Sequence, residues 1–108
     1  MSEVRLGPED AGRTVTVAAG NPVVLALPES PGTGYTWEVE EIPPGARVLE
    51  ERYERPADAG IGAQSQHVFV VDAGSGGAVR LRHGRPWLGE EGILDRYEFS
   101  VVARDEAR

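Results

Sequence analysis

Few side chains in this chain could make or break bonds, and their spacing does not suit catalysis. Cysteine is absent, which excludes a thiolate nucleophile, a disulfide and a thiolate metal site. The two histidines, His67 and His83, are in phase with apolar neighbours, which is typical of buried or half-buried rings. Ser30 has no suitable base nearby in the sequence, and the proline after it does not form a nucleophile elbow. With so few ligands, we expect neither a metal site nor any other cofactor.

Carboxyl groups are the remaining candidates for acid–base chemistry. Adjacent glutamates occur as Glu40-Glu41, Glu50-Glu51 and Glu90-Glu91. Neighbouring residues on a strand point to opposite faces, so such a pair does not bring two carboxylates to one reacting bond. We interpret these pairs as solvated charge and predict that the protein is not an enzyme. Its chemistry is therefore expected to be recognition of a partner.

The clearest candidate for recognition is a tryptophan in the short segment Arg85-Pro86-Trp87. Apolar and polar residues alternate before this segment, at residues 78–83, and after it, at residues 95–102, as in strands with one buried face. Proline restricts the backbone and the nearby glycines permit tight turns, so Trp87 stands on a stiffened loop. The indole either folds over its own domain as a plug or is offered to a partner. Arg85 either braces its own loop or pairs with a carboxylate.

Length and charge limit the class of protein. A chain of 108 residues fits a single domain, residues 1–108, that is large enough for one hydrophobic core. The formal charge of −7 disfavours binding to nucleic acids or anionic membranes, because both need a basic face. No apolar run approaches the roughly 20 residues of a membrane helix. No signal peptide is visible, so we expect a cytoplasmic protein or a mature secreted or periplasmic form, and we expect a monomer.

Short apolar runs separated by turn residues predict an all-β fold. Glycine and proline account for 14 and 8 residues, and they cluster between the runs. We predict little or no helix and about seven strands, at residues 14–17, 22–28, 35–40, 47–53, 66–71, 78–83 and 95–102. Tyr35, Trp37 and Val39 are expected to face the core, and residues 72–77 are expected to form a turn. This pattern is typical of a sandwich or a barrel.

Three long glycine-containing loops follow the second, fourth and sixth predicted strands. They span residues 29–34, 55–63 and 83–89. Because consecutive strands of a sandwich run in opposite directions, loops separated by two strands emerge at the same end. We therefore expect the three loops to be neighbours in space. Binding residues often lie on loops that a rigid sheet holds in place.

The three loops also carry short motifs in a fixed order. They read Ser30-Pro31-Gly32-Thr33-Gly34-Tyr35 followed by Trp37, then Gly60-Ile61-Gly62-Ala63, and finally Arg85-Pro86-Trp87. In this order and spacing, over residues 14–104, the chain resembles the chagasin family, which inhibits papain-like cysteine peptidases. The family pattern is Asn-Pro-Thr-Thr-Gly-Tyr/Phe, Gly-x-Gly-Gly and Arg-Pro-Trp, so Ser30, Gly32 and Ala63 depart from it.

The resemblance implies an immunoglobulin-like β-sandwich that inhibits a papain-like cysteine peptidase reversibly, by wedging the three loops into the active-site cleft. It implies that the first loop covers the catalytic cysteine and histidine of the peptidase and that Trp87 stacks on an aromatic surface beside them. The implied contact residues are Ser30, Pro31, Gly32, Thr33, Gly34, Tyr35, Gly60, Ile61, Gly62, Ala63, Arg85, Pro86 and Trp87. The alternative is a non-inhibitory immunoglobulin-like module that binds another protein or a glycan through the same loops.

Overall fold

The computed structural model describes residues 4–18, 20–29, 34–55 and 65–104. Ten elements follow one another in this part of the chain: β1 (Val4–Leu6), the 3₁₀ segment η1 (Pro8–Asp10), β2 (Thr14–Ala18), β3 (Val23–Glu29), β4 (Thr36–Glu41), β5 (Arg47–Glu54), β6 (Ser65–Asp72), β7 (Gly76–Gly84), the 3₁₀ segment η2 (Pro86–Gly92) and β8 (Ile93–Arg104). None of the helical segments in the described residues is long and apolar enough to cross a membrane.

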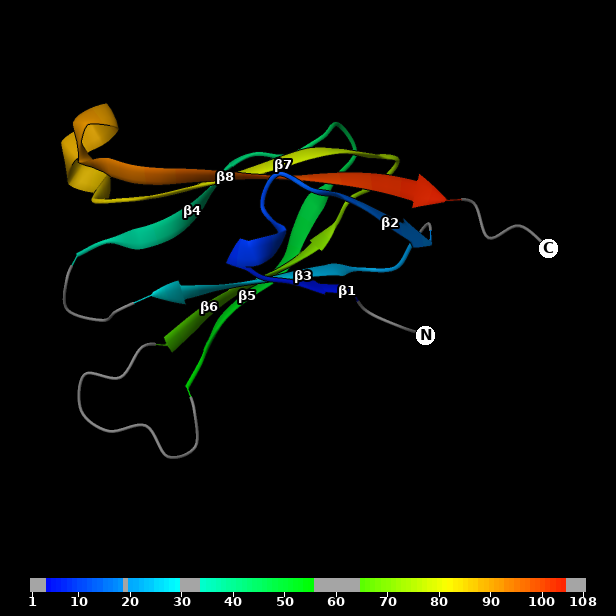
Figure 1. The fold of residues 1–108 in the computed structure, drawn as a ribbon, viewed down its shortest axis with the longest axis horizontal. Helices are drawn as coiled ribbons and strands as arrows, with labels where there is room; N and C mark the ends of the chain where they lie inside the picture. The colour runs from blue at the N-terminus through cyan, green and yellow to red at the C-terminus, as the bar shows by residue number, and fades with distance from the viewer. Residues whose placement is uncertain (1–3, 19, 30–33, 56–64, 105–108) are drawn as a thin grey trace.

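The strands form two four-stranded sheets that face each other (Figure 1). One sheet has the order β1-β3-β6-β5 and the other has the order β2-β8-β7-β4. The pairs β1–β3 and β2–β8 are parallel, and the remaining pairs are antiparallel. The two-sheet sandwich is the architecture that the spacing of the apolar runs predicts.

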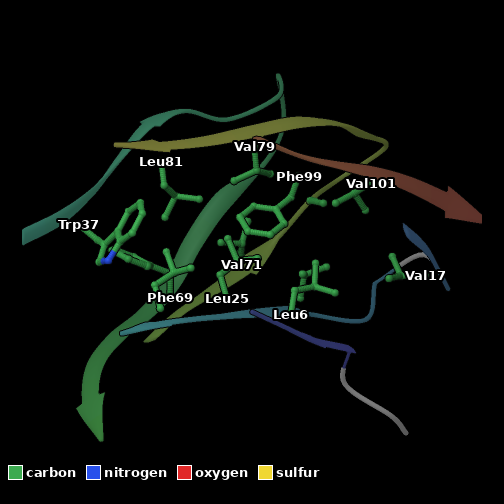
Figure 2. Packing of buried hydrophobic residues seen from close by; sticks show 13 residues of the cluster. Leu6, Val17, Leu25, Trp37, Phe69, Val71, Val79, Leu81, Phe99 and Val101 are labelled. Carbon is green, nitrogen blue, oxygen red and sulfur yellow. The ribbon is translucent and has the colours of Figure 1, made fainter. Parts of the chain in front are cut away.

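Apolar side chains from both sheets fill the space between them, as Figure 2 shows. Trp37, Leu81 and Phe99 of the second sheet face Leu25, Phe69 and Val71 of the first, and all six are at most 3% exposed. The alternation of strand 36–41 is confirmed, because Trp37 is buried and Val39 lies against the core. Burial of this apolar surface is the main source of stability in such a sandwich.

The outer face of the first sheet is apolar as well, although the sequence does not predict it. Val24, Ala26, Val68 and Val70 form a second buried cluster there. In the strand register Arg5 lies beside Val24, and Arg52 lies beside Val68. Both arginines pair with Glu54, at 2.9 and 3.0 Å. Their apolar stems therefore cover the cluster while their charged ends remain in water.

The structure corrects three boundaries. There are eight strands in the described residues rather than seven, because the three-residue strand β1 is too short to show a periodic pattern. Glu29 belongs to β3 and not to the first loop, and Gly76 and Gly77 belong to β7 and not to the preceding turn. The segment after Arg85, predicted as an irregular loop, is the 3₁₀ segment η2, with a kink at Gly89 where φ is 63°.

Among the adjacent glutamates, Glu40, Glu41, Glu50 and Glu90 pair with arginines rather than only with water. On the second sheet the ion pairs are Arg80–Glu41, Arg80–Glu98, Arg82–Glu38, Arg96–Glu40 and Arg96–Glu90. Glu50 contacts Arg52 and Glu51 contacts His67. Most of these partners come from other elements, so local sequence does not reveal them, whereas Arg52 lies two residues from Glu50 on the same strand. The pairs between exposed side chains add little to stability, because water and salt screen them.

Candidate functional site

The strand ends that flank the three predicted loops lie at one end of the sandwich, on the left in Figure 1. In the first sheet, Glu29 is paired with Ser65, and Glu54 is paired with Gln66. In the second sheet, Gly84 is paired with both Thr36 and Ile93. These four pairings join the end of each strand that enters a loop to the start of a strand that leaves one. The roots of all three loops are therefore neighbours.

The structure describes only some of the predicted contact residues. Ser30, Pro31, Gly32 and Thr33 of the first loop, and Gly60, Ile61, Gly62 and Ala63 of the second, lie outside the described residues. Gly34, Tyr35, Arg85, Pro86 and Trp87 are described. Gly34 and Tyr35 belong to the first loop, and Arg85, Pro86 and Trp87 belong to the third. Gly34 lies against Trp87, and Tyr35 lies against Arg85.

The indole of Trp87 lies across the backbone of Gly34. A Cβ atom at Gly34 would be 2.7 Å from Cη2 of Trp87, which is closer than real carbon contacts allow. Gly34 also has a φ of +85°, a conformation that favours glycine. Trp87 is nevertheless 69% exposed, so it does not plug the end of the sandwich. The indole is seated on the first loop and open to a partner.

Arg85 joins the first and third loops a second time. Its guanidinium carbon lies 4.3 Å from the centroid of the Tyr35 ring, which is a cation–π arrangement. Tyr35 of the first loop therefore supports the guanidinium of Arg85, while the choice between bracing its own loop and pairing with a carboxylate stays a prediction. Within η2 the backbone closes on itself, since Leu88 donates to the carbonyl of Arg85 and Arg85 donates to the carbonyl of Gly92. These contacts fix the position from which Trp87 projects.

Beneath these loops, aromatic rings lead from the surface to the core. The ring of His83 is stacked on Trp37 at 4.5 Å with an interplanar angle of 11°, and it lies 5.8 Å from Tyr35. Burial lowers the pKa of His83, although the charges of Asp95 and Glu29 oppose this. The Nε2 atom of His83 is buried and has no hydrogen-bond partner among the described residues. This half-buried ring therefore favours its neutral form.

A buried polar cluster, which we call the Glu29 cluster, ties the strand ends together below the first two loops. Oε1 of Glu29 accepts hydrogen bonds from the backbone N–H of Trp37 at 3.0 Å and from the Thr36 hydroxyl at 3.1 Å. The same oxygen lies 2.7 Å from Nδ1 of His67. Nε2 of His67 lies 2.7 Å from Oε2 of Glu51. The cluster thus joins β3, β4, β5 and β6 where the loops begin and end.

Sequence reasoning placed Glu29 in a loop and did not connect it with His67. Burial raises the pKa of Glu29, but the hydrogen bonds from His67 and Trp37 and the charge of His67 outweigh it, so the pKa is lowered overall. Glu29 and His67 are 38 residues apart, and only the pairing of β3 with β6 brings them together. The one local signal was the position of His67 in phase with Phe69 and Val71.

The described part of the chain offers no group of three or more histidine, aspartate and glutamate side chains arranged to hold a metal ion. Its loop end instead presents an exposed indole, a braced guanidinium and two closely joined loops. Exposed aromatic residues on a rigid support are typical of protein-binding surfaces. The geometry is therefore that of a recognition surface.

Comparison with known proteins identifies a family with these features. The family model described as chagasin family peptidase inhibitor I42 matches residues 16–101. Chagasin of Trypanosoma cruzi is 35% identical over 100 residues, which cover 85% of this chain and 90% of chagasin.

Solved structures of inhibitors share the sandwich. The crystal structure of the cysteine protease inhibitor EhICP2 from Entamoeba histolytica matches with a TM-score of 0.77 and 22% identity, covering 94% of this chain and 96% of that chain. PbICP-C, solved in complex with falcipain-2, matches with a TM-score of 0.57 and 14% identity, covering 96% of this chain and 100% of that chain. At these identities the likeness concerns the fold, and it confirms the predicted immunoglobulin-like sandwich.

Proposed function

Because the chain belongs to the chagasin family of peptidase inhibitors, we propose that its target is a papain-like cysteine peptidase, which one copy of the chain binds reversibly. The protein is an inhibitor and not an enzyme. EhICP2 is a cysteine protease inhibitor, and PbICP-C forms a complex with falcipain-2. The same class of target suits a chain that shares their fold and carries the three loop motifs.

The exposed indole of Trp87 carries the proposal. Trp87 is a large side chain that is 69% exposed. Because its indole is seated on Gly34, it has little conformational freedom left to lose on binding. Tryptophan is among the residues whose burial dominates the binding energy of protein interfaces. We assign Trp87 the role of an anchor on one flank of the cleft, with Arg85 and Pro86 as its support.

The first loop is proposed to occupy the deepest part of the cleft. Glycine has no side chain to collide with the catalytic residues, so Gly32 and Gly34 permit a close approach of the backbone. The Thr33 hydroxyl is proposed to form a hydrogen bond there, and Pro31 is proposed to restrict the loop before binding. Ser30 and Tyr35 complete this contact. A loop that fills the cleft without offering a bond in attackable geometry blocks the peptidase without being cleaved.

The second loop is proposed to run along the other side of the cleft. An extended backbone at Gly60, Gly62 and Ala63 suits pairing with the backbone of the peptidase. Ile61 is then the natural occupant of an apolar subsite. The strand that leaves the second loop begins beside the end of the strand that enters the first, because Ser65 is paired with Glu29. The three loops together form a wedge with Trp87 on its flank.

A panel of peptidases tests the proposal. Purified protein is titrated against papain and several cathepsin-like enzymes, with a serine peptidase as the control. We expect submicromolar inhibition of at least one papain-like enzyme and none of the serine peptidase. If none of the papain-like enzymes is inhibited at tens of micromolar, the target class is wrong, and the non-inhibitory binding module becomes the better account.

A further inference from the structure

The Glu29 cluster contains a histidine whose two ring nitrogens both face carboxylates. His67 is 1% exposed, and each of its nitrogens lies 2.7 Å from a carboxylate oxygen, one from Glu29 and one from Glu51. A neutral imidazole has one N–H donor and one lone pair. In the neutral form, therefore, one carboxylate would face a lone pair at hydrogen-bond distance. Only a doubly protonated ring donates to both.

The environment of His67 supports a ring held in one place. It is stacked between Tyr53, at 4.3 Å, and Phe69, at 4.4 Å. Among the described residues, the titratable groups in contact with it are Glu29 from β3 and Glu51 and Tyr53 from β5. Burial raises the pKa of Tyr53, and the nearby charges of Glu29 and Glu51 add to this, so the phenol stays neutral. Two carboxylates thus contact the ring directly, and Arg55 supplies a fixed positive charge beside the hollow that Glu29 and Tyr53 line.

The next titratable ring on the Glu29 side is His83 of β7, which burial keeps neutral. The ring in hydrogen-bond contact with the buried carboxylate is therefore that of His67. The pKa of Glu29 agrees with this, since burial alone would raise it and the hydrogen bond and charge of His67 contribute to lowering it.

This arrangement spans the roots of two inhibitory loops. Glu29 is the last residue before the first loop, and it binds Thr36 and Trp37, which follow that loop. Glu51 lies on the strand that enters the second loop, and His67 lies on the strand that leaves it. A single ring therefore connects both ends of both loops through charge-assisted hydrogen bonds, which are about twice as strong as neutral ones.

Taking the proposed inhibition of a papain-like peptidase as its basis, we infer that His67 is a positioning residue for the first two loops. As a doubly protonated ring, it bridges Glu29 and Glu51 and holds the four strand ends in the spacing that the cleft requires. Loss of one ring proton turns a lone pair toward a carboxylate, opens the bridge and weakens binding.

Glu51→Gln is the variant that separates this role from general stability. Its side-chain amide donates to Nε2 of a neutral His67, while Nδ1–H still donates to Glu29, so the bridge no longer requires the second proton. The Glu51 side chain is 54% exposed, so the fold tolerates the change. Glu50→Gln is the matched control, because it removes the same charge from the next residue, which contacts Arg52 and not His67.

Inhibition constants against papain are measured for the wild type and both variants between about pH 5.5 and about pH 8.5, where histidine changes charge. The ratio of the wild-type constant to that of Glu51→Gln cancels the titration of the peptidase. We expect this ratio to rise at least about threefold toward high pH, as one charge-assisted hydrogen bond is lost. The ratio to Glu50→Gln stays constant. His67→Phe, which keeps the ring stacking, weakens inhibition at all pH values.

Nitrogen-15 NMR of the free protein reports the charge of the ring without any peptidase. We expect the shifts of a doubly protonated imidazole for His67 and of a neutral one for His83. An unprotonated nitrogen in His67 where inhibition is strongest, or a ratio that does not change with pH, overturns the positioning role and leaves the proposed function standing. No inhibition by the wild type overturns the proposed function, while the NMR shifts still decide whether the bridge exists.

Discussion

Replacing Trp87 with alanine distinguishes a binding anchor from a structural plug. The two roles predict different losses of folding stability and of binding energy. Trp87 is 69% exposed, so less than a third of the side chain is covered in the free protein. With roughly 250 Å² for a whole tryptophan and about 25 cal/mol per Å², the covered part stabilises the fold by at most about 2 kcal/mol. A fully buried tryptophan would cost roughly 3–5 kcal/mol on truncation. An interface anchor costs roughly 2–4 kcal/mol of binding energy, or about 30-fold to 800-fold in the inhibition constant.

Both quantities are measured on the same preparations. Denaturant unfolding gives the change in the free energy of unfolding, and titration of the most sensitive peptidase of the panel gives the inhibition constant. Val102→Ala is the control, since Val102 is 48% exposed near the opposite end of β8 and should change neither quantity much. A Trp87→Ala variant that inhibits like the wild type refutes the anchor. A loss of stability well above about 2 kcal/mol refutes the reasoning from exposure.

Three further substitutions test neighbouring features of the loop end. Gly34→Ala places a side chain on a residue with positive φ and against the indole of Trp87. We expect it to cost about 1–2 kcal/mol of stability and to weaken inhibition. Unchanged inhibition would show that this contact does not position Trp87. Gly32→Thr restores the family's residue and should improve inhibition if the first loop covers the catalytic residues; a weaker or equal inhibition constant counts against that placement. The pKa of His83 is lowered from its ordinary 6.5 by burial, so the unfolded chain binds more protons and stability falls as the pH drops below 6.5. His83→Phe should reduce this acid loss in denaturant titrations at neutral and mildly acidic pH, and an identical loss in both proteins would exclude His83 as its source.

The sheets were predictable because their signals are local. A buried strand shows its alternation within six residues, as at Trp37 and Val39, and glycine and proline mark most of the breaks between strands. The convergence of the loop roots follows from the same pattern, because strand direction alternates in a sandwich. The errors lie where local signals are weak or misleading. Strand β1 has only three residues, and Gly76 and Gly77 have the composition of a turn but the pairing of β7.

Side chains that work through long-range pairs were not predictable. The environment of Glu29 resembled a loop, since Ser30 and Pro31 follow it, and its burial depends on partners from β4 and β6. The seat of Trp87 on Gly34 has the same origin, because the two residues are far apart in sequence and meet only when β4 is paired with β7. Motifs in the loops indicated which residues a partner would contact, but not which residues hold the loops in place.

The loop end therefore depends on two different kinds of support. Arg85 lies over Tyr35, Tyr35 is tilted against His83, and the stacking of His83 on Trp37 links the first and third loops to the core. The Glu29 cluster links the first and second loops through charged hydrogen bonds. The contacts of the neutral His83 ring persist above its lowered pKa, whereas a bridge between two carboxylates requires a proton on the ring between them. The position of Trp87 should consequently be steady at neutral and alkaline pH, where His83 is neutral, while the spacing of the first two loops follows the charge of His67.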